Sequence, residues 1–228
     1  MSGRTEVVGR VRLTYAVAGP LSYVSVLDMG RLWERILRRA GVPLAYTQGY
    51  HPHPRIYFAA PLPVGYTSEC ELIDVLLSEP MSPGDLLRAL TRQVPAGLTT
   101  MAAEEVAIKA PKPQSRMEAA HYVVEIETTA GTDAVRAALA ALLARDTIMA
   151  QRHRRGKIVD YDMRRLIHDL VHVAHEGNRH RIAMNLRCGS HGSGRPERIV
   201  PELALGKAEL ISIHRTRLIW DGAEEHTT

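Results

Sequence analysis

The chain has 228 residues, of which 45% are hydrophobic, and this suits one large domain or two domains of about 110 residues with real buried cores. No apolar run approaches the ~20 residues of a membrane span, and the N-terminus lacks an apolar signal core, so the sequence predicts a cytoplasmic protein without a membrane partner. The net charge is a modest +4, and the two cysteines, Cys70 and Cys188, exclude a CxxC motif, a cysteine zinc site and an iron–sulfur ligand set.

The first half of the chain alternates between strand and helix patterns. Arg10–Tyr15 alternates apolar and polar residues, which is typical of a half-buried strand. Ser25 and Asp28 have the spacing of a capping box ahead of an apolar helical stripe, and Gly41 with Pro43 ends that helix. Further strands are predicted at 44–46, 56–59, 70–77 and 98–106, and a second helix opens at Ser82-Pro83. This β-α-β-β-α-β order is that of a ferredoxin-like unit.

The second half repeats the order of elements after a linker. Residues 107–119 contain two prolines and no periodicity, so they separate a first domain, 1–106, from a second domain, 120–228. Strands are predicted at 122–127, 147–151, 158–161, 170–175, 179–187 and 211–220, with helices opened by Asp133 and by Pro196 and a short helical piece at 162–167. The predicted fold class is therefore α+β: two ferredoxin-like (βαββαβ) units in tandem, with antiparallel sheets and helices on one face.

Arginine dominates the basic residues. Four of the 29 basic residues are lysine, and the other 25 are arginine. A guanidinium binds phosphate through two parallel hydrogen bonds and stacks on bases, which favours a nucleic-acid partner. A GC-rich genome also enriches arginine, so only clusters of arginine count as an indication of RNA binding.

A loop of histidine and proline, residues 49–55, separates two predicted strands of the first domain. Its prolines prevent a helix, so its side chains stand on stiff, irregular backbone. His51 or His53 would serve as a catalytic acid or base near neutral pH, and Arg55 would hold a phosphate. The alternative is a loop shaped by its prolines whose imidazoles are solvated. No metal site is expected, because the spacing offers no third ligand for the His-x-His pair.

A glycine-rich segment, residues 188–196, leads from a predicted strand into a helix. Two of its glycines have Walker A spacing, but Arg195 replaces the lysine and Pro196 replaces the residue that binds magnesium, so nucleotide hydrolysis is not expected. Exposed backbone N–H groups beside a helix start would still bind phosphate, and a flexible turn is the alternative. The residues expected to contact phosphate here are Gly189, Gly192, Gly194 and Arg195.

Two further clusters of basic residues lie in the second half. Residues 152–157 form a basic turn, which is either an RNA contact or a solvated hairpin tip. The turn residues expected to contact RNA are Arg152, Arg154, Arg155 and Lys157. His168, His172 and His175 would stack on a helix, but the flanking pattern predicts a strand, where His172 and His175 point to opposite faces and no zinc site forms.

Several short motifs carry a family resemblance. They are SVLDMGRLWER (25–35), RRAGVPLAY (38–46), QGYHPHPRI (48–56) and PLPVG (61–65), with weaker matches at 160–164 and 195–196. These motifs resemble the radical-SAM-linked domain of unknown function, although Val26 and Tyr50 depart from the histidine and phenylalanine common there. The resemblance implies a stand-alone partner of a radical-SAM protein encoded nearby. That partner would carry an iron–sulfur cluster, S-adenosylmethionine and cobalamin, whereas this chain lacks CxxxCxxC and is expected to hold no cofactor.

Three functions are open at this point. The favoured one is a radical-SAM-associated accessory protein, not catalytic alone, that binds RNA such as tRNA for modification by its partner. The second is a metal-independent RNA-processing enzyme that uses His51 and His53. The third is a protein-interaction adaptor that works through residues 25–40 or an open sheet face. The first two expect the histidine loop and the glycine-rich segment to line one basic groove.

Overall fold

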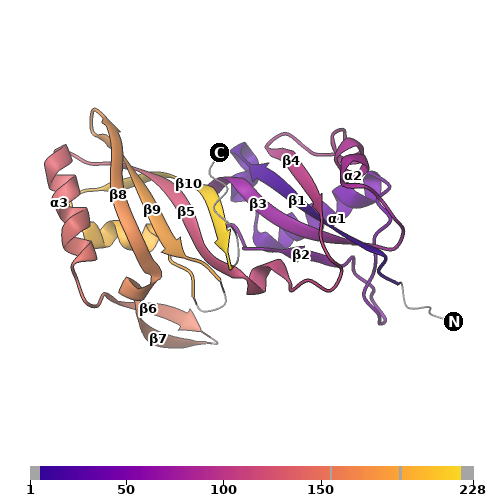
Figure 1. Ribbon diagram of the computed structural model, residues 1–228. Coiled ribbons are helices and arrows are strands. Elements are labelled where there is room, and N and C mark those ends of the chain that lie inside the picture. The colour runs from indigo at the N-terminus through magenta and orange to yellow at the C-terminus, as the bar shows by residue number, and fades with distance from the viewer. Residues whose placement is uncertain (1–5, 155, 190–191, 222–228) are drawn as a thin grey trace. The chain divides into compact units, whose positions relative to one another are not determined.

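The computed structural model describes residues 6–154, 156–189 and 192–221 (Figure 1). The chain divides into two compact units, Met1–Arg116 (unit 1) and Met117–Thr228 (unit 2). Each unit combines helices with antiparallel strands, so the predicted mixed α+β class is confirmed. Within the described ranges, no helix combines the length and the apolar character needed to cross a membrane.

Unit 1 follows the predicted order of strands and helices. Its elements are β1 (Gly9–Val17), the 3-10 turn η1 (Gly19–Tyr23), α1 (Val26–Arg39), β2 (Ile56–Phe58), β3 (Tyr66–Leu77), α2 (Pro83–Leu90), β4 (Leu98–Glu105) and the 3-10 turn η2 (Pro113–Ser115). The strands pair antiparallel in the order β4-β1-β3-β2. The predicted strand at 44–46 makes only isolated bridges, from Leu44 to Leu77 and from Tyr46 to Pro54.

The core of unit 1 lies on the face of the sheet that both helices cover. Alternate residues of β1, including Leu13 and Tyr15, are buried there against Trp33 of α1 and Leu86 of α2. Helix α1 begins as the capping box predicts, because the Ser25 hydroxyl accepts a 3.2 Å hydrogen bond from the backbone N–H of Asp28. The two helices therefore shield one face of the sheet of unit 1, and neither of them covers its other face.

The opposite face of unit 1 holds a buried ion network. Asp74 of β3 is 0% exposed and accepts hydrogen bonds from Arg10 (2.9 and 2.5 Å) and from Arg12 (2.8 and 3.1 Å) of β1. Arg10 also donates to the carbonyls of Ala110 (2.5 Å) and Pro111 (2.9 Å). Part of the segment predicted as a linker thus packs on this face, and its last residues, from Met117 onward, already belong to strand β5.

Unit 2 has the same strand order with one insertion. Its elements are β5 (Met117–Glu127), α3 (Thr132–Leu143), β6 (Met149–Arg154), β7 (Lys157–Asp162), η3 (Met163–Leu166), β8 (Ile167–Glu176), β9 (Arg179–Arg187), α4 (Pro196–Ile199), η4 (Val200–Leu203) and β10 (Glu209–Trp220). The main strands pair antiparallel in the order β10-β5-β9-β8, and β6 and β7 form a separate two-stranded ribbon.

Two helices of unit 2 differ from the prediction. The N-cap of α3 is Gly131 without a side-chain cap, so Asp133 lies inside the helix instead of capping it. The helix expected to run from Pro196 to Leu205 lasts four residues and continues as the 3-10 turn η4. Pro201 accounts for the change, because it has no N–H to donate to an earlier carbonyl of an α-helix.

Candidate nucleic-acid interface

The β6–β7 ribbon displays its basic residues on one face. Arg152 stands opposite Val159, and Ala150 stands opposite Tyr161, so these side chains share a face. The guanidinium of Arg152 lies 5.0 Å from the centre of the Tyr161 ring. Lys157 is exposed on this face, and its register partner is Arg154. Arg155 lies outside the described residues, so its predicted contact with RNA stays a prediction.

The other face of the ribbon has a different chemistry. It carries Gln151 and His153 opposite Asp160 and Ile158, and the Gln151 amide donates a 3.0 Å hydrogen bond to Asp160. At its base, Asp162 accepts hydrogen bonds from the backbone N–H groups of Ile148 (2.9 Å) and Arg164 (3.0 Å), which lower the pKa of Asp162 and keep it ionised. The ribbon is therefore anchored at its base, cationic on one face and partly acidic on the other.

The glycine-rich segment uses its described N–H groups inside unit 2. Gly189 donates to the Ser193 hydroxyl (3.3 Å), Gly192 to the Gly189 carbonyl (3.2 Å) and Gly194 to the Arg187 carbonyl (2.8 Å). Arg195 forms a 3.5 Å ion pair with Glu197. Residues 190–191 lie outside the described ranges. A phosphate contact at the described glycines would need to displace these bonds, so phosphate binding here stays a prediction without support from their geometry.

The histidine loop is an exposed hairpin of unit 1. The N–H of Thr47 donates to the carbonyl of His53, whose own N–H donates to the Thr47 hydroxyl, both at 2.9 Å. His51 and His53 are exposed, and Arg55 lies 3.4 Å from the Tyr57 hydroxyl. Among the described residues no carboxylate hydrogen-bonds to either imidazole, so neither ring is held as an oriented base would be. A shared groove with the glycine-rich segment stays a prediction, because the two regions belong to different units.

Three histidines meet on the buried face of the unit 2 sheet, which the sequence reasoning missed. A register shift in β8 between His172 and Ala174 puts His172 and His175 on the same side of the strand, contrary to the expectation of opposite faces. His172 Nε2 lies 3.1 Å from His180 Nδ1, and the rings of His175 and His180 are 5.6 Å apart. In the described ranges, no group of three or more His, Cys, Asp or Glu side chains is placed to hold a metal ion.

We expect His172 of this cluster to make the stability of unit 2 depend on pH. The pKa of His172 lies below its usual 6.5, first because the ring is partly buried and then because His180 and Arg136 of α3 lie nearby. The unfolded chain binds a proton at His172 at a higher pH than the folded chain does, so the stability that depends on the neutral His172 ring is present above pH 6.5 and lost as the pH falls below it. We expect the urea midpoint to decrease as the pH is lowered from 7 to 5. This decrease should be smaller in His172→Gln.

His53→Gln, in the exposed loop, serves as the control for this titration. Urea unfolding followed by circular dichroism at pH 7, 6 and 5 provides the measurement. An unchanged pH slope in His172→Gln contradicts the assignment.

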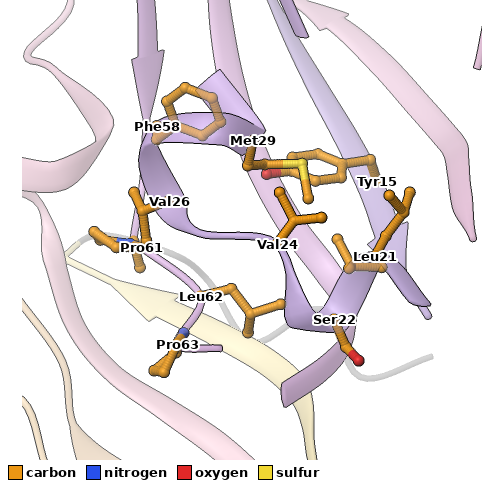
Figure 2. A pocket seen from close by; sticks show the side chains of 12 residues that line it. Tyr15, Leu21, Ser22, Val24, Val26, Met29, Phe58, Pro61, Leu62 and Pro63 are labelled. Atoms are coloured by element: carbon orange, nitrogen blue, oxygen red, sulfur yellow. The ribbon is translucent and has the colours of Figure 1, made fainter. Parts of the chain in front are cut away.

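A small apolar pocket marks the N-terminal end of α1. Figure 2 shows its lining from β1, η1, the start of α1, the end of β2 and the loop after it, with Met29, Phe58 and Leu62 among the side chains. Its volume is only about 20 Å³, room for a methyl group or one water rather than a small-molecule ligand. The lining residue Val26 (40%) is exposed, and so are three apolar residues that adjoin lining residues in the sequence: Tyr23 (74%), Leu27 (76%) and Val64 (55%). We call these four residues the apolar patch.

Comparison with solved structures shows likeness of fold alone. A chain in the crystal structure of a Cbf5–Nop10–Gar1 complex superposes with a TM-score of 0.51 at 10% identity, over 90% of this chain and 48% of that chain. A chain of the archaeal box H/ACA sRNP Nop10–Cbf5 complex gives 0.47 at 11% identity, over 90% and 47% of the two chains. This protein thus spans about half the length of each of these two solved chains.

Sequence comparison identifies the family. No curated protein matches the chain. A family model matches residues 10–196, which include the motifs from Ser25 to Gly65 and both sheets up to the start of α4. The chain therefore belongs to the family described as uncharacterized protein conserved in bacteria (DUF2344).

Proposed function

We propose that this protein is an accessory protein, without catalysis of its own, that binds RNA and presents it to a separate modifying enzyme. The β6–β7 ribbon carries this proposal. Its exposed cations lie on one face, and Arg152 lies over the ring of Tyr161. A row of cations beside an aromatic ring suits the phosphate backbone of RNA, and the ring and guanidinium planes offer surfaces for base stacking.

The second part of the proposal concerns the scaffold. We propose that both units are ferredoxin-like. The strand orders β4-β1-β3-β2 and β10-β5-β9-β8 are equivalent once the β6–β7 ribbon is treated as an insertion after α3. The ribbon is then an added recognition element on a repeated scaffold.

The third part concerns the partner. The motifs at 25–65 resemble the radical-SAM-linked domain, so we propose that a radical-SAM protein encoded nearby is the modifying enzyme and that both act in the cytoplasm. The iron–sulfur cluster, S-adenosylmethionine and cobalamin would belong to that partner. This chain supplies two cysteines, Cys70 and Cys188, which do not amount to a cluster ligand set.

Charge reversal on the ribbon tests the RNA proposal. We expect Arg152→Glu and Lys157→Glu each to weaken binding of labelled bulk tRNA by about tenfold or more at 100 mM salt. Each should also lower the slope of log K against log salt by about 0.7 to 0.9, because one phosphate contact is lost. Fluorescence anisotropy from about 50 to 300 mM salt provides both quantities.

The matched control carries the same change in charge on the opposite face. Gln151→Glu with His153→Glu lowers the net charge by two, as Arg152→Glu does, but on the face that already carries Asp160. The control should bind almost like the wild type. If the control and Arg152→Glu lose the same affinity for RNA, the effect depends on net charge alone and not on the face of the ribbon. Wild-type protein without salt-sensitive RNA binding would remove the RNA function altogether.

A second candidate function is protein docking through the apolar patch. Leu27 and Tyr23 are about three-quarters exposed beside a pocket that fits one side-chain tip, which favours a partner protein over a small ligand. In this case the radical-SAM protein would co-purify from nuclease-treated lysate, and Leu27→Glu would abolish the association. The enzymatic alternative has less support, because His51 and His53 lack an orienting carboxylate among the described residues.

A further inference from the structure

A row of four polar residues crosses the outer face of the unit 2 sheet. Arg217 of β10 stands opposite His121 of β5, His121 opposite Asn185 of β9, and Asn185 opposite Asp169 of β8. Directly opposed residues in antiparallel strands have side chains on the same face. The helices and the buried apolar residues, such as Val124 and Met184, occupy the other face. The row is therefore separate from the hydrophobic core.

Two atoms at the centre of this row are buried without partners. Within the described part of the chain, neither His121 Nε2 nor Asn185 Oδ1 has a hydrogen-bond partner. A buried polar atom without a partner destabilises the folded state, so such atoms call for a functional explanation. Burial and the adjacent Arg217 lower the pKa of His121, so its ring is neutral at pH 7 and offers one donor and one acceptor.

An open pocket adjoins the row. Its volume is about 560 Å³, within the range of small-molecule sites, and Asn185, Arg187, His168 and Glu118 line it together with the apolar side chains of Met117 and Ile219. Arg187 is exposed, and no carboxylate among the described residues lies within ion-pair distance of it. Every residue of this lining belongs to unit 2.

The larger pocket of unit 1 lacks such available groups. Its volume is about 740 Å³, but Arg10 is held by Asp74, and Arg88 pairs with Asp85. The two arginines of this pocket are thus already engaged and its other charged groups are carboxylates, whereas the unit 2 row leaves His121 Nε2 and Asn185 Oδ1 without partners among the described residues.

The chemistry of the row and its pocket fits a nucleobase better than a phosphate. A phosphate site presents donors alone, but this pocket also presents acceptors, because the amide of Asn185 offers a donor and an acceptor and Glu118 adds a carboxylate. Base edges combine donors and acceptors in this way, and apolar side chains such as Met117 and Ile219 suit the face of a base. We propose that this pocket binds one unpaired base of the RNA, with Asn185 reading its edge and Arg187 holding the adjoining phosphate.

This inference rests on the proposed RNA function, and the experiment separates the two. Labelled 12-nucleotide RNAs of a single base (A, C, G or U) are titrated against the full chain, and the four nucleoside monophosphates are tested by saturation-transfer NMR. We expect one base to bind about tenfold more tightly than the weakest, as one bidentate contact allows. Asn185→Ala should abolish this preference with little change in the salt slope, and Asn185→Asp should change which base is preferred.

Asn178→Ala, at the exposed turn between β8 and β9, is the matched control and should keep the preference. Because Asn185→Ala removes an unpartnered buried acceptor, the thermal midpoint should stay level or rise, which excludes unfolding as the cause. If RNA binding is sensitive to salt but shows no preference among the bases, and Asn185→Ala leaves this binding unchanged, then the base pocket is overturned and the RNA function stands. Binding of monophosphates that depends on Asn185, without salt-sensitive binding of RNA, supports the pocket and overturns the RNA function. If neither the RNAs nor the nucleoside monophosphates bind, both the base pocket and the RNA function are overturned.

Discussion

Replacing Asp74 with asparagine will lower the free energy of unfolding by about 3–5 kcal/mol. The carboxylate is fully buried and is the shared acceptor for Arg10 and Arg12, which are 2% and 11% exposed. Asparagine has nearly the same size, so little packing is lost, but the negative charge disappears and an amide donor replaces an acceptor. Arg12 keeps a 3.6 Å contact with Glu104, whereas Arg10 keeps only backbone carbonyls as described partners.

Urea unfolding followed by circular dichroism measures this loss. Asp85→Asn is the control, because Asp85 also accepts from its capping serine and pairs with an arginine but is exposed on the surface. An exposed pair of this kind contributes no more than about 1 kcal/mol. If both variants lose the same stability, the Asp74 network is not the buried ion cluster described above.

Replacing Gly189 with alanine will cost about 3–4 kcal/mol, the second large effect. Its φ of +138° disfavours any residue with a Cβ, and an added Cβ would stand 2.2 Å from the carbonyl oxygen of Met117. That oxygen is backbone of strand β5, so it cannot move aside without disturbing the sheet. Gly189 is therefore required by the close approach of two backbones, whether or not a phosphate binds nearby.

Gly49→Ala separates the clash from the backbone strain. Gly49 has a similar φ of +125°, but an added Cβ would meet nothing within 4 Å. Its replacement should cost about 1–2 kcal/mol from strain alone. Thermal or urea unfolding of both variants gives the comparison, and equal losses would show that the contact with Met117 is unimportant.

Local patterns in the sequence were sufficient to predict most of the elements. The alternation at Arg10–Tyr15, the serine caps at Ser25 and Ser82 and the turn before Arg179 each depend on neighbouring residues, and each appears in the structure. Such signals act through the backbone within a few residues, so one sequence reveals them. The two strands of the basic ribbon were predicted for the same reason, although they extend to Arg154 and from Lys157 and so take up residues that were expected to belong to the turn.

Features that depend on distant contacts were not predictable in this way. The alternation of β1 shows that Arg10 and Arg12 share a face, but not that Asp74 and the segment from Ala110 bury that face. The bulge in β8 that gathers His172 and His175 arises from pairing with β9, and a period of two gives the wrong face beyond it. Likewise, the hydrogen bond from the Gly194 N–H to the Arg187 carbonyl folds the glycine-rich segment back onto the end of β9, and the spacing of the glycines does not reveal this contact.

The β6–β7 ribbon leaves and rejoins unit 2 at adjacent points, since Met149 and Asp162 face each other across its base. Its strands pair with each other in a separate small sheet, so the ladder of the main sheet does not run through it. Pairs of residues can then be added or removed along it without shifting the register of β5, β9 or β10. A longer or shorter ribbon would therefore move Arg152 and Lys157 farther from the scaffold or closer to it while the pairing of the main sheet stays unchanged.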